Sequence, residues 1–492
     1  MARLGINLIA PEGKRRRRID VYTSQVNRSN ALHDSNAKQI GATNLFASES
    51  VVWLWVSIVF IVYVVRFFHL ISRYAVNIFF ADQWDFNNAT LFEKHSLWQM
   101  FRWQHGPHRQ GLGALFEKLV DPLLGWNSRA EAFVIGGVIV AAAICALWLK
   151  KRLCGNLSVF DVAIPAILFT TAQWQTLFMT QNFAHGPFPL LLLLLYCISW
   201  SSKTQAVRYP LLLFVNFVTI YTGFGVFLGV LTPILLILDY WTGTPQTRLS
   251  KIYFMSAIIV ALSSLVSFFV GYKFQSAISC FSLRPQSPTS YVHFVALMFA
   301  NFFAVRRLTL AAELVGTIVL TAVLISLITC IWLLFRDNRT NVVGDNRSRA
   351  LIVVSLTAFT LVFCFNTAYG RLCEGLQASS ISRYVIYLEP AVLGFYFFLL
   401  SFHQSTMRKF LLSGFLIAVV AASLYRDRGG MGFAWNVKQH WKTCYLQTED
   451  IEGCNKVADF PIYPNPQRNH LKEKLEYLKR TRQNLYLDQK VQ

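Results

Sequence analysis

Long apolar segments recur along most of this chain of 492 residues, and no other feature constrains its fold as strongly. A window of about 19 residues, the length used to find membrane spans, detects about eleven such segments. They lie near residues 51–71, 131–149, 160–178, 186–200, 208–221, 225–240, 252–272, 310–335, 351–369, 384–402 and 409–425. In lipid, an α-helix satisfies all of its own backbone groups, whereas an open strand does not. The sequence therefore predicts an all-α polytopic membrane protein with about eleven transmembrane helices, some of them short enough to be broken helices.

The composition agrees with a membrane location and excludes other classes of protein. Hydrophobic residues make up 54% of the chain and charged residues 14%, against roughly 45–50% and 25% in soluble domains. The net charge of +21 could indicate a nucleic-acid partner, but no nucleic-acid-binding motif accompanies the basic residues, which gather beside apolar segments. We therefore expect membrane lipids, and no nucleic acid, among the partners.

The basic residues of the short loops fall on one side of the predicted helices. They are Lys150, Lys151, Arg152, Lys203, Arg208, Arg248, Lys251, Arg336, Arg339, Arg347, Arg349, Arg408 and Lys409. Cytoplasmic loops carry such an excess, so this side and the N-terminus are predicted to be cytoplasmic. The outer side then receives loops 72–130, 273–309 and 370–383 together with the C-terminus. This topology suits a multi-pass protein of a bacterial inner membrane.

Three regions follow from this plan. They are a disordered basic tail at residues 1–48, a transmembrane domain at 49–425 whose first outer loop, 72–130, carries amphipathic helices, and a small extracytoplasmic segment at 426–492. Cys444 and Cys454 lie close together in that last segment, in a compartment where disulfides form, so a local disulfide is predicted. The apolar stretch 291–305 ends at two arginines, Arg306 and Arg307, and is interpreted as an interfacial or re-entrant helix, with a membrane span as the alternative.

Two acids, Asp82 and Asp85, open the first outer loop directly after the first apolar segment. Acids three residues apart share one face of a helix, and the neighbouring Trp84 would withdraw water from them. A carboxylate in such a place suits a general base. The alternative interpretation is an acidic N-terminal cap of a short helix.

A compact polar turn follows about twenty residues later, in the sequence WQHGPHRQGLG that starts at Trp103. Its His108 and Arg109 could donate hydrogen bonds to a phosphate. His105 and His108 could also ligate a metal, but their spacing of three without an assured carboxylate partner does not define a metal site, and none is predicted.

Polar residues also gather in later segments near the outer side. Gln173, Gln175 and Gln181 could hydrogen-bond sugar hydroxyls or, alternatively, hold helices together. Arg371 and Arg383 oppose the usual charge bias of outer loops, which makes them candidates for binding a lipid-linked phosphate.

Taken together, these motifs resemble those of the GT-C class of membrane glycosyltransferases, which includes protein O-mannosyltransferases and the lipid A aminoarabinose transferases. The resemblance rests on the first-loop acids, the HGPHR turn, the QWQ segment and the segment from Gly370 to Tyr384, and covers most of residues 50–490. One departure concerns the acids: paired acids or DxD motifs are common in that class, whereas this chain has DxxD, so either acid can be the base.

The resemblance implies transfer of a sugar, with inversion, from a polyprenyl-phosphate donor to an extracytoplasmic glycan, lipid or protein acceptor. Asp82, or else Asp85, would be the base, while Arg371, Arg383, Arg109 and His108 would bind the donor phosphate. Trp84, His105, Gln173, Gln175 and Gln181 would contact sugar or acceptor. No cofactor is required, although Asp85 could support a divalent cation.

Two other classes of function remain open from the sequence. A transporter or flippase for lipid-linked saccharides would need similar spans and arginines, but the chain shows no matching repeats. A polysaccharide polymerase or ligase would depend on outer arginines and would not require the acidic first loop.

Overall fold

The computed structural model describes residues 49–179, 182–243, 247–276, 278–282, 287–305, 308–337, 345–402, 404–425, 428–464 and 469–488. The predicted disordered tail, residues 1–48, lies outside these ranges. Contacts divide the chain into two units, Met1–Val52 and Trp53–Gln492, and the description below concerns the second. Apart from one short hairpin, the regular structure described in this unit is helical, in agreement with the predicted all-α class.

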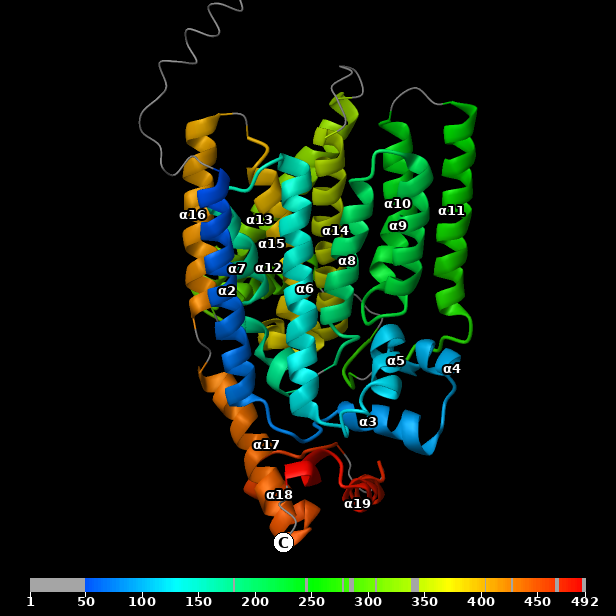
Figure 1. The fold of residues 1–492 in the computed structure, drawn as a ribbon, viewed down its shortest axis with the longest axis vertical. Coiled ribbons are helices and arrows are strands. Elements are labelled where there is room, and N and C mark those ends of the chain that lie inside the picture. The colour runs from blue at the N-terminus through cyan, green and yellow to red at the C-terminus, as the bar shows by residue number, and fades with distance from the viewer. Residues whose placement is uncertain are drawn as a thin grey trace, which may run out of the picture. The chain divides into compact units, whose positions relative to one another are not determined.

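Long helices run side by side through most of the second unit (Figure 1). They are α2 (Glu49–Tyr74), α6 (Ser128–Cys154), α8 (Pro187–Trp200), α9 (Gln205–Ile220), α10 (Val226–Trp241), α11 (Arg248–Phe269), α12 (Pro288–Phe302), α13 (Leu310–Asp337), α14 (Asp345–Arg371), α15 (Val385–Leu399) and α16 (Ser405–Leu424). In the described part of the chain, six segments are long and apolar enough to cross a membrane. Their number is smaller than the eleven expected, because several predicted spans are helices of only 14–16 residues.

Two predicted segments have a different structure from the one expected. Residues 160–178 do not form one helix but η3 (Val159–Val162), α7 (Ala163–Leu168), η4 (Thr171–Gln173) and η5 (Gln175–Met179). The break follows Thr170, whose hydroxyl accepts a hydrogen bond from the backbone N–H of Ala172 and so competes with the helix. The stretch 291–305 lies mostly in α12, whose residues 294–302 are more buried than an interfacial helix requires, while the re-entrant alternative stays a prediction.

The loop at residues 72–130, predicted to be the first outer loop, contains three short α-helices, one π-helical turn and the hairpin. Its elements are α3 (Gln83–Asn87), η2 (Asn88–Phe92), α4 (Leu97–Phe101), β1 (Gln104–His105), β2 (His108–Arg109) and α5 (Gly111–Leu119). The hairpin is joined to the turn between α9 and α10 by a bridge between Arg109 and Gly223. Gly111 has φ of +45°, and a Cβ there would lie 2.1 Å from the carbonyl oxygen of Tyr221. Glycine at this position therefore lets the loop lie directly on the bundle.

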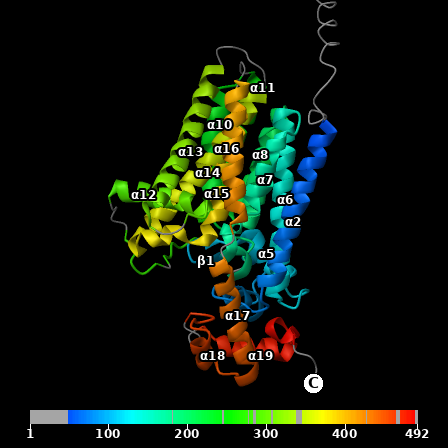
Figure 2. The same ribbon diagram turned by 90° about the vertical axis from the view of Figure 1, so that its left-hand side faces the viewer.

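The C-terminal segment consists of α17 (Arg428–Thr448), α18 (Ile451–Val457), α19 (Leu471–Thr481) and η9 (Asn484–Asp488), and it lies at the same end of the bundle as the first loop (Figure 2). The structure bonds Cys444 to Cys454, as the sequence predicts. It also bonds Cys280 to Cys373, a pair that the sequence did not indicate.

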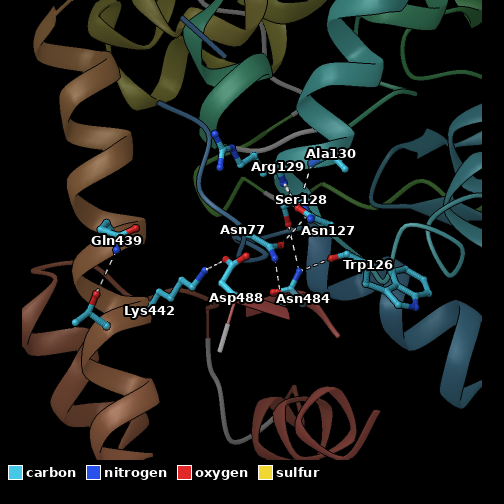
Figure 3. Close-up of polar contacts among 11 residues, drawn as sticks. Asn77, Trp126, Asn127, Ser128, Arg129, Ala130, Gln439, Lys442, Asn484 and Asp488 are labelled. Atoms are coloured by element: carbon cyan, nitrogen blue, oxygen red, sulfur yellow. Dashed lines mark hydrogen bonds and ion pairs between the residues drawn. The ribbon is translucent and has the colours of Figure 1, made fainter. Parts of the chain in front are cut away.

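Asn484 joins the C-terminal segment to the first loop and to the start of α6 (Figure 3). Its side-chain amide donates to the carbonyl of Trp126, its backbone N–H donates to the carbonyl of Gly125, and its own carbonyl accepts from Asn77 at 2.7 Å. Asn77 in turn accepts from the backbone N–H of Ser128. Because Asn484 is fully buried, water cannot replace these bonds if they are lost.

We predict that Asn484→Ala lowers the free energy of unfolding by about 2 kcal/mol, because it leaves the buried carbonyl of Trp126 without its donor. The change should appear as a lower melting temperature and faster proteolysis within residues 428–488. Gln439→Ala is the matched control, since that side chain makes only a 3.4 Å contact with Thr443 on the surface of α17. Equal stability of the two variants would contradict the role assigned to Asn484.

Candidate functional site

The two acids of the first loop lie at the start of α3, but their surroundings differ. Asp82 occupies the N-terminal cap position without making a side-chain capping bond, and it is exposed. Asp85 is half-buried, lies 2.7 Å from Nε2 of His105, and accepts a hydrogen bond from the hydroxyl of Tyr463. The capping alternative is therefore not what the Asp82 side chain does in this structure. Asp85 is held in place, whereas the carboxylate of Asp82 faces solvent.

The Asp85–His105 pair alters the protonation of both groups. Burial raises the pKa of Asp85, but the hydrogen bond and charge of His105, with help from Tyr463 and Lys474, outweigh burial and lower it overall. Burial likewise opposes protonation of His105, but Asp85 and Asp82 prevail and raise the pKa of this imidazole. The pair is therefore ionic over a wide range of pH.

His105 also completes a group of ligand atoms with the two acids. One atom each of Asp82, Asp85 and His105 lies within 4.8 Å of the others, so the group could hold a cation. The pairing that the sequence suggested for a metal, His105 with His108, is not part of this group.

Two imidazoles lie beside the acidic group. His108 packs edge-to-face on His185, with ring centroids 4.8 Å apart, and on Phe224 at 4.3 Å. Burial, together with the positive charges of His105, Arg383 and Arg371, lowers the pKa of His108 to about 3. Burial and the same kind of repulsion also lower the pKa of His185. Both rings are neutral at physiological pH and can donate a hydrogen bond but carry no charge.

Arg371 and Arg383 lie near enough to His108 for their charges to act on it, and they differ in their partners. Arg371 ends α14 and forms an ion pair with Glu374 at 3.0 Å. Arg383 lies in η8 (Ser382–Tyr384), and within the described residues no carboxylate is at ion-pair distance from it. Its backbone N–H donates to Oε1 of Gln175 at 3.1 Å. The sequence motifs around Gln175 and Arg383, about 200 residues apart, therefore meet at one site.

Arg109 does not take the role predicted from the sequence. Its guanidinium is buried and donates to the backbone carbonyls of Phe268, Arg102 and Val270. With its donors engaged in this way, Arg109 holds the loop on the bundle and has little capacity left for a phosphate.

Two other predicted contacts also need correction. Trp84 is 0% exposed and packs against Tyr463 and Phe79, so it belongs to the core and cannot contact a sugar. Gln173 is buried, and its amide donates to the carbonyl of Leu168 at 3.0 Å, as the alternative of a structural amide anticipated. Gln181 lies outside the described residues.

Several residues of the site were missed in the sequence. Tyr463 and Lys474 reach Asp85 and its surroundings from the C-terminal segment, and no local pattern indicates which remote residue will pack on a loop. His185 was visible in its motif HGP, and its ring nitrogen lies 3.2 Å from the amide of Gln110. A polar residue at a break between apolar segments was the signal that could have identified it.

The stability of the site should depend on pH through His105. A raised folded-state pKa means that the stabilisation is fully present below the unfolded value of about 6.5 and is lost as pH rises through the folded value. The contribution of Asp85 to stability has the opposite pH dependence: because its pKa is lowered, this contribution is lost only as the pH falls into the acid range. We therefore predict that melting temperature falls more steeply between pH ~6 and ~8.5 in the wild type than in His105→Gln. The control is His440→Gln, at an exposed histidine, in which the melting temperature should change with pH as in the wild type. If the melting temperature of His105→Gln also changed with pH as in the wild type, the pH dependence could not be assigned to His105.

No protein-family model, curated protein or solved structure matches this chain. The resemblance that the motifs suggest therefore remains a prediction. What the site can do is argued below from its own geometry and charges.

Proposed function

We propose that this protein is a membrane glycosyltransferase that moves a sugar from a polyprenyl-phosphate donor to an acceptor hydroxyl. The observation that carries the proposal is the arrangement around His108. His105, which belongs to the group with Asp82 and Asp85, is paired with His108 in the hairpin, and Arg371 and Arg383 lie near enough for their charges to act on His108. Transfer from a sugar phosphate needs these two functions together: a proton acceptor for the hydroxyl and cations for the departing phosphate.

Asp82 is the base in this proposal. Its carboxylate is exposed and makes no capping bond, so it can approach an acceptor hydroxyl. The hydroxyl oxygen forms the new bond to the anomeric carbon while its proton passes to Asp82. Asp85 is less suited, because His105 and Tyr463 already occupy its oxygens and lower its pKa. Asp85 orients His105, which can bind the acceptor or sugar.

In this proposal the donor phosphate binds beside Arg371, Arg383 and His108. The bond from the anomeric carbon to the phosphate oxygen breaks, and the polyprenyl phosphate leaves with the electron pair and a growing negative charge. Arg383, which has no acidic partner among the described residues, is the principal cation for this charge. Arg371 is already in an ion pair with Glu374, so its charge is partly neutralised, and neutral His108 can add one hydrogen bond to the phosphate.

The location of the site fits a reaction outside the cytoplasm. The first loop and the C-terminal segment lie at one end of the helices (Figure 2), whereas the basic loop residues belong to the opposite helix ends, such as the end of α6 and the start of α11. By the positive-inside rule, the end with the site is extracytoplasmic and the N-terminus is cytoplasmic. In a bacterial inner membrane the acceptors would be envelope glycans, lipids or proteins.

We predict that Asp82→Asn lowers sugar transfer by about 10²- to 10⁴-fold, because Asn keeps the size of the side chain but cannot accept the proton. The measurement is a mass-spectrometric comparison of envelope glycans, glycolipids and glycoproteins from cells with the wild type, with each variant, and without the protein. Glu93→Gln, an exposed acid of the same loop, is the control and should transfer normally. Near-normal transfer by a folded Asp82→Asn protein would reject this base, and loss of transfer in Asp85→Asn alone would move the role there.

We also predict that Arg383→Lys reduces transfer about tenfold at limiting donor, because Lys keeps the charge but loses the planar fork that grips two phosphate oxygens. Arg371→Lys should have a smaller effect, since Glu374 competes for that side chain. Arg408→Lys, at the opposite end of the helices, should have none. If Arg383→Lys transfers like the parent, this arginine is only an interfacial anchor.

A further inference from the structure

Three carboxylates meet in the interior beneath the first loop, apart from the candidate site. Glu117 lies on α5, Asp121 in the turn that follows, and Glu131 in the first turn of α6. Their exposed fractions are 3%, 0% and 1%. One oxygen atom from each lies within 4.8 Å of the other two. The carboxylate trio, as we call Glu117, Asp121 and Glu131, is thus far less exposed than the acids around Asp82.

Little in the surrounding protein compensates these charges. Gln83 donates a hydrogen bond to Oε2 of Glu131 at 2.9 Å. The other carboxylate oxygen of Glu131 and both carboxylate oxygens of Asp121 receive no hydrogen bond from the described residues. The positive charge of Lys438 acts on Glu131 from a distance. Three buried carboxylates at these separations repel one another strongly unless a cation or protons lie among them. The carboxylate of Asp121 is fully buried beside Glu117 and Glu131 and has no hydrogen-bond partner among the described residues. It therefore requires either a cation or protons.

We propose that Glu117, Asp121 and Glu131 form a structural binding site for a hard divalent cation such as Ca²⁺ or Mg²⁺. The ligands are all oxygen, which favours these ions over zinc. Two oxygens bound to one ion at roughly 2.1–2.4 Å can be at most about 4.2–4.8 Å apart, which agrees with the spread of the trio. A divalent cation also leaves only one negative charge on three carboxylates, and Lys438 is placed to offset it.

The position of the trio explains what a cation there would do. It connects α5 with the start of α6, and through Gln83 it reaches α3, the helix that carries Asp85. The backbone N–H of Phe80 donates to the amide oxygen of Gln83, so both the nitrogen and the oxygen of this side-chain amide are hydrogen-bonded. The cation would therefore stabilise the part of the first loop that packs against the start of α6, and it would not contact the substrate. This inference does not depend on the proposed transferase activity.

The test uses the full-length protein in detergent, stripped with EDTA and then returned to ~1 mM CaCl₂, MgCl₂ or MnCl₂, with Mn²⁺ as a probe. We expect at least one cation to raise the melting temperature by about 3 °C or more, reversibly with EDTA, because a cation that binds only the folded chain stabilises it. Metal analysis after gel filtration should find about one cation per chain. Asp121→Asn and Glu117→Gln should each abolish the shift.

Two controls distinguish this site from other acids. Glu93→Gln removes an exposed acid of the same loop, and Asp85→Asn removes an acid of the group around Asp82; both should keep the cation-dependent shift. Loss of the shift in Asp85→Asn together with its retention in Asp121→Asn would assign the cation to the other group. A wild type that shows no cation dependence, with an Asp121→Asn variant that melts higher than the parent, would show that the trio shares protons instead. Either result overturns the proposal, and having two trio variants guards against one that fails to fold.

Discussion

The guanidinium of Arg109 holds the candidate site on the helical bundle. This buried cation has no carboxylate partner in the described structure and is instead surrounded by carbonyl oxygens of Phe268, Val270 and Arg102. The rings of Tyr221 and Phe268, with centroids 5.8 Å and 5.5 Å from Cζ, add cation–π attraction. Because His105 and His108 are in the same hairpin, Arg109 helps to fix their positions, together with the bridge to Gly223 and the hydrogen bond from Tyr272 to the carbonyl of Pro107. Removal of Arg109 would take the donor from the buried carbonyl of Phe268, whereas the carbonyl of Val270 would keep a donor from Arg102.

The helices of the bundle were largely predictable because lipid imposes a simple rule on sequence. A chain that crosses the membrane must pair its own backbone groups, so apolar length alone identifies α2, α6, α11, α13 and α14. The rule fails where protein, and not lipid, surrounds the backbone. Residues 160–178 can break into short turns because they are buried among other helices, and α12 can be short for the same reason.

The candidate site was only partly predictable, because residue type indicates chemistry but not partners. Asp82, Asp85 and His105 were recognised from their types, yet the ion pair between Asp85 and His105 is a property of the folded loop. A guanidinium suits a phosphate and a cluster of carbonyls equally well, which is why Arg109 was misinterpreted. Glu131 lies only two positions from Arg129 in the sequence, yet Arg129 contacts Ser72, and Glu131 is buried beside Glu117 and Asp121.

The disulfide between Cys280 and Cys373 has a consequence for the connectivity of the molecule. The two cysteines are 93 positions apart and enclose α12, α13 and α14 in one covalent ring. A single cut of the backbone anywhere inside that ring leaves two fragments that are still one molecule. The segment between Arg371 and Arg383 is thus joined to the loop after α11 twice, once through the backbone and once through the disulfide. It stays attached to that loop even when the backbone between Cys280 and Cys373 is cut.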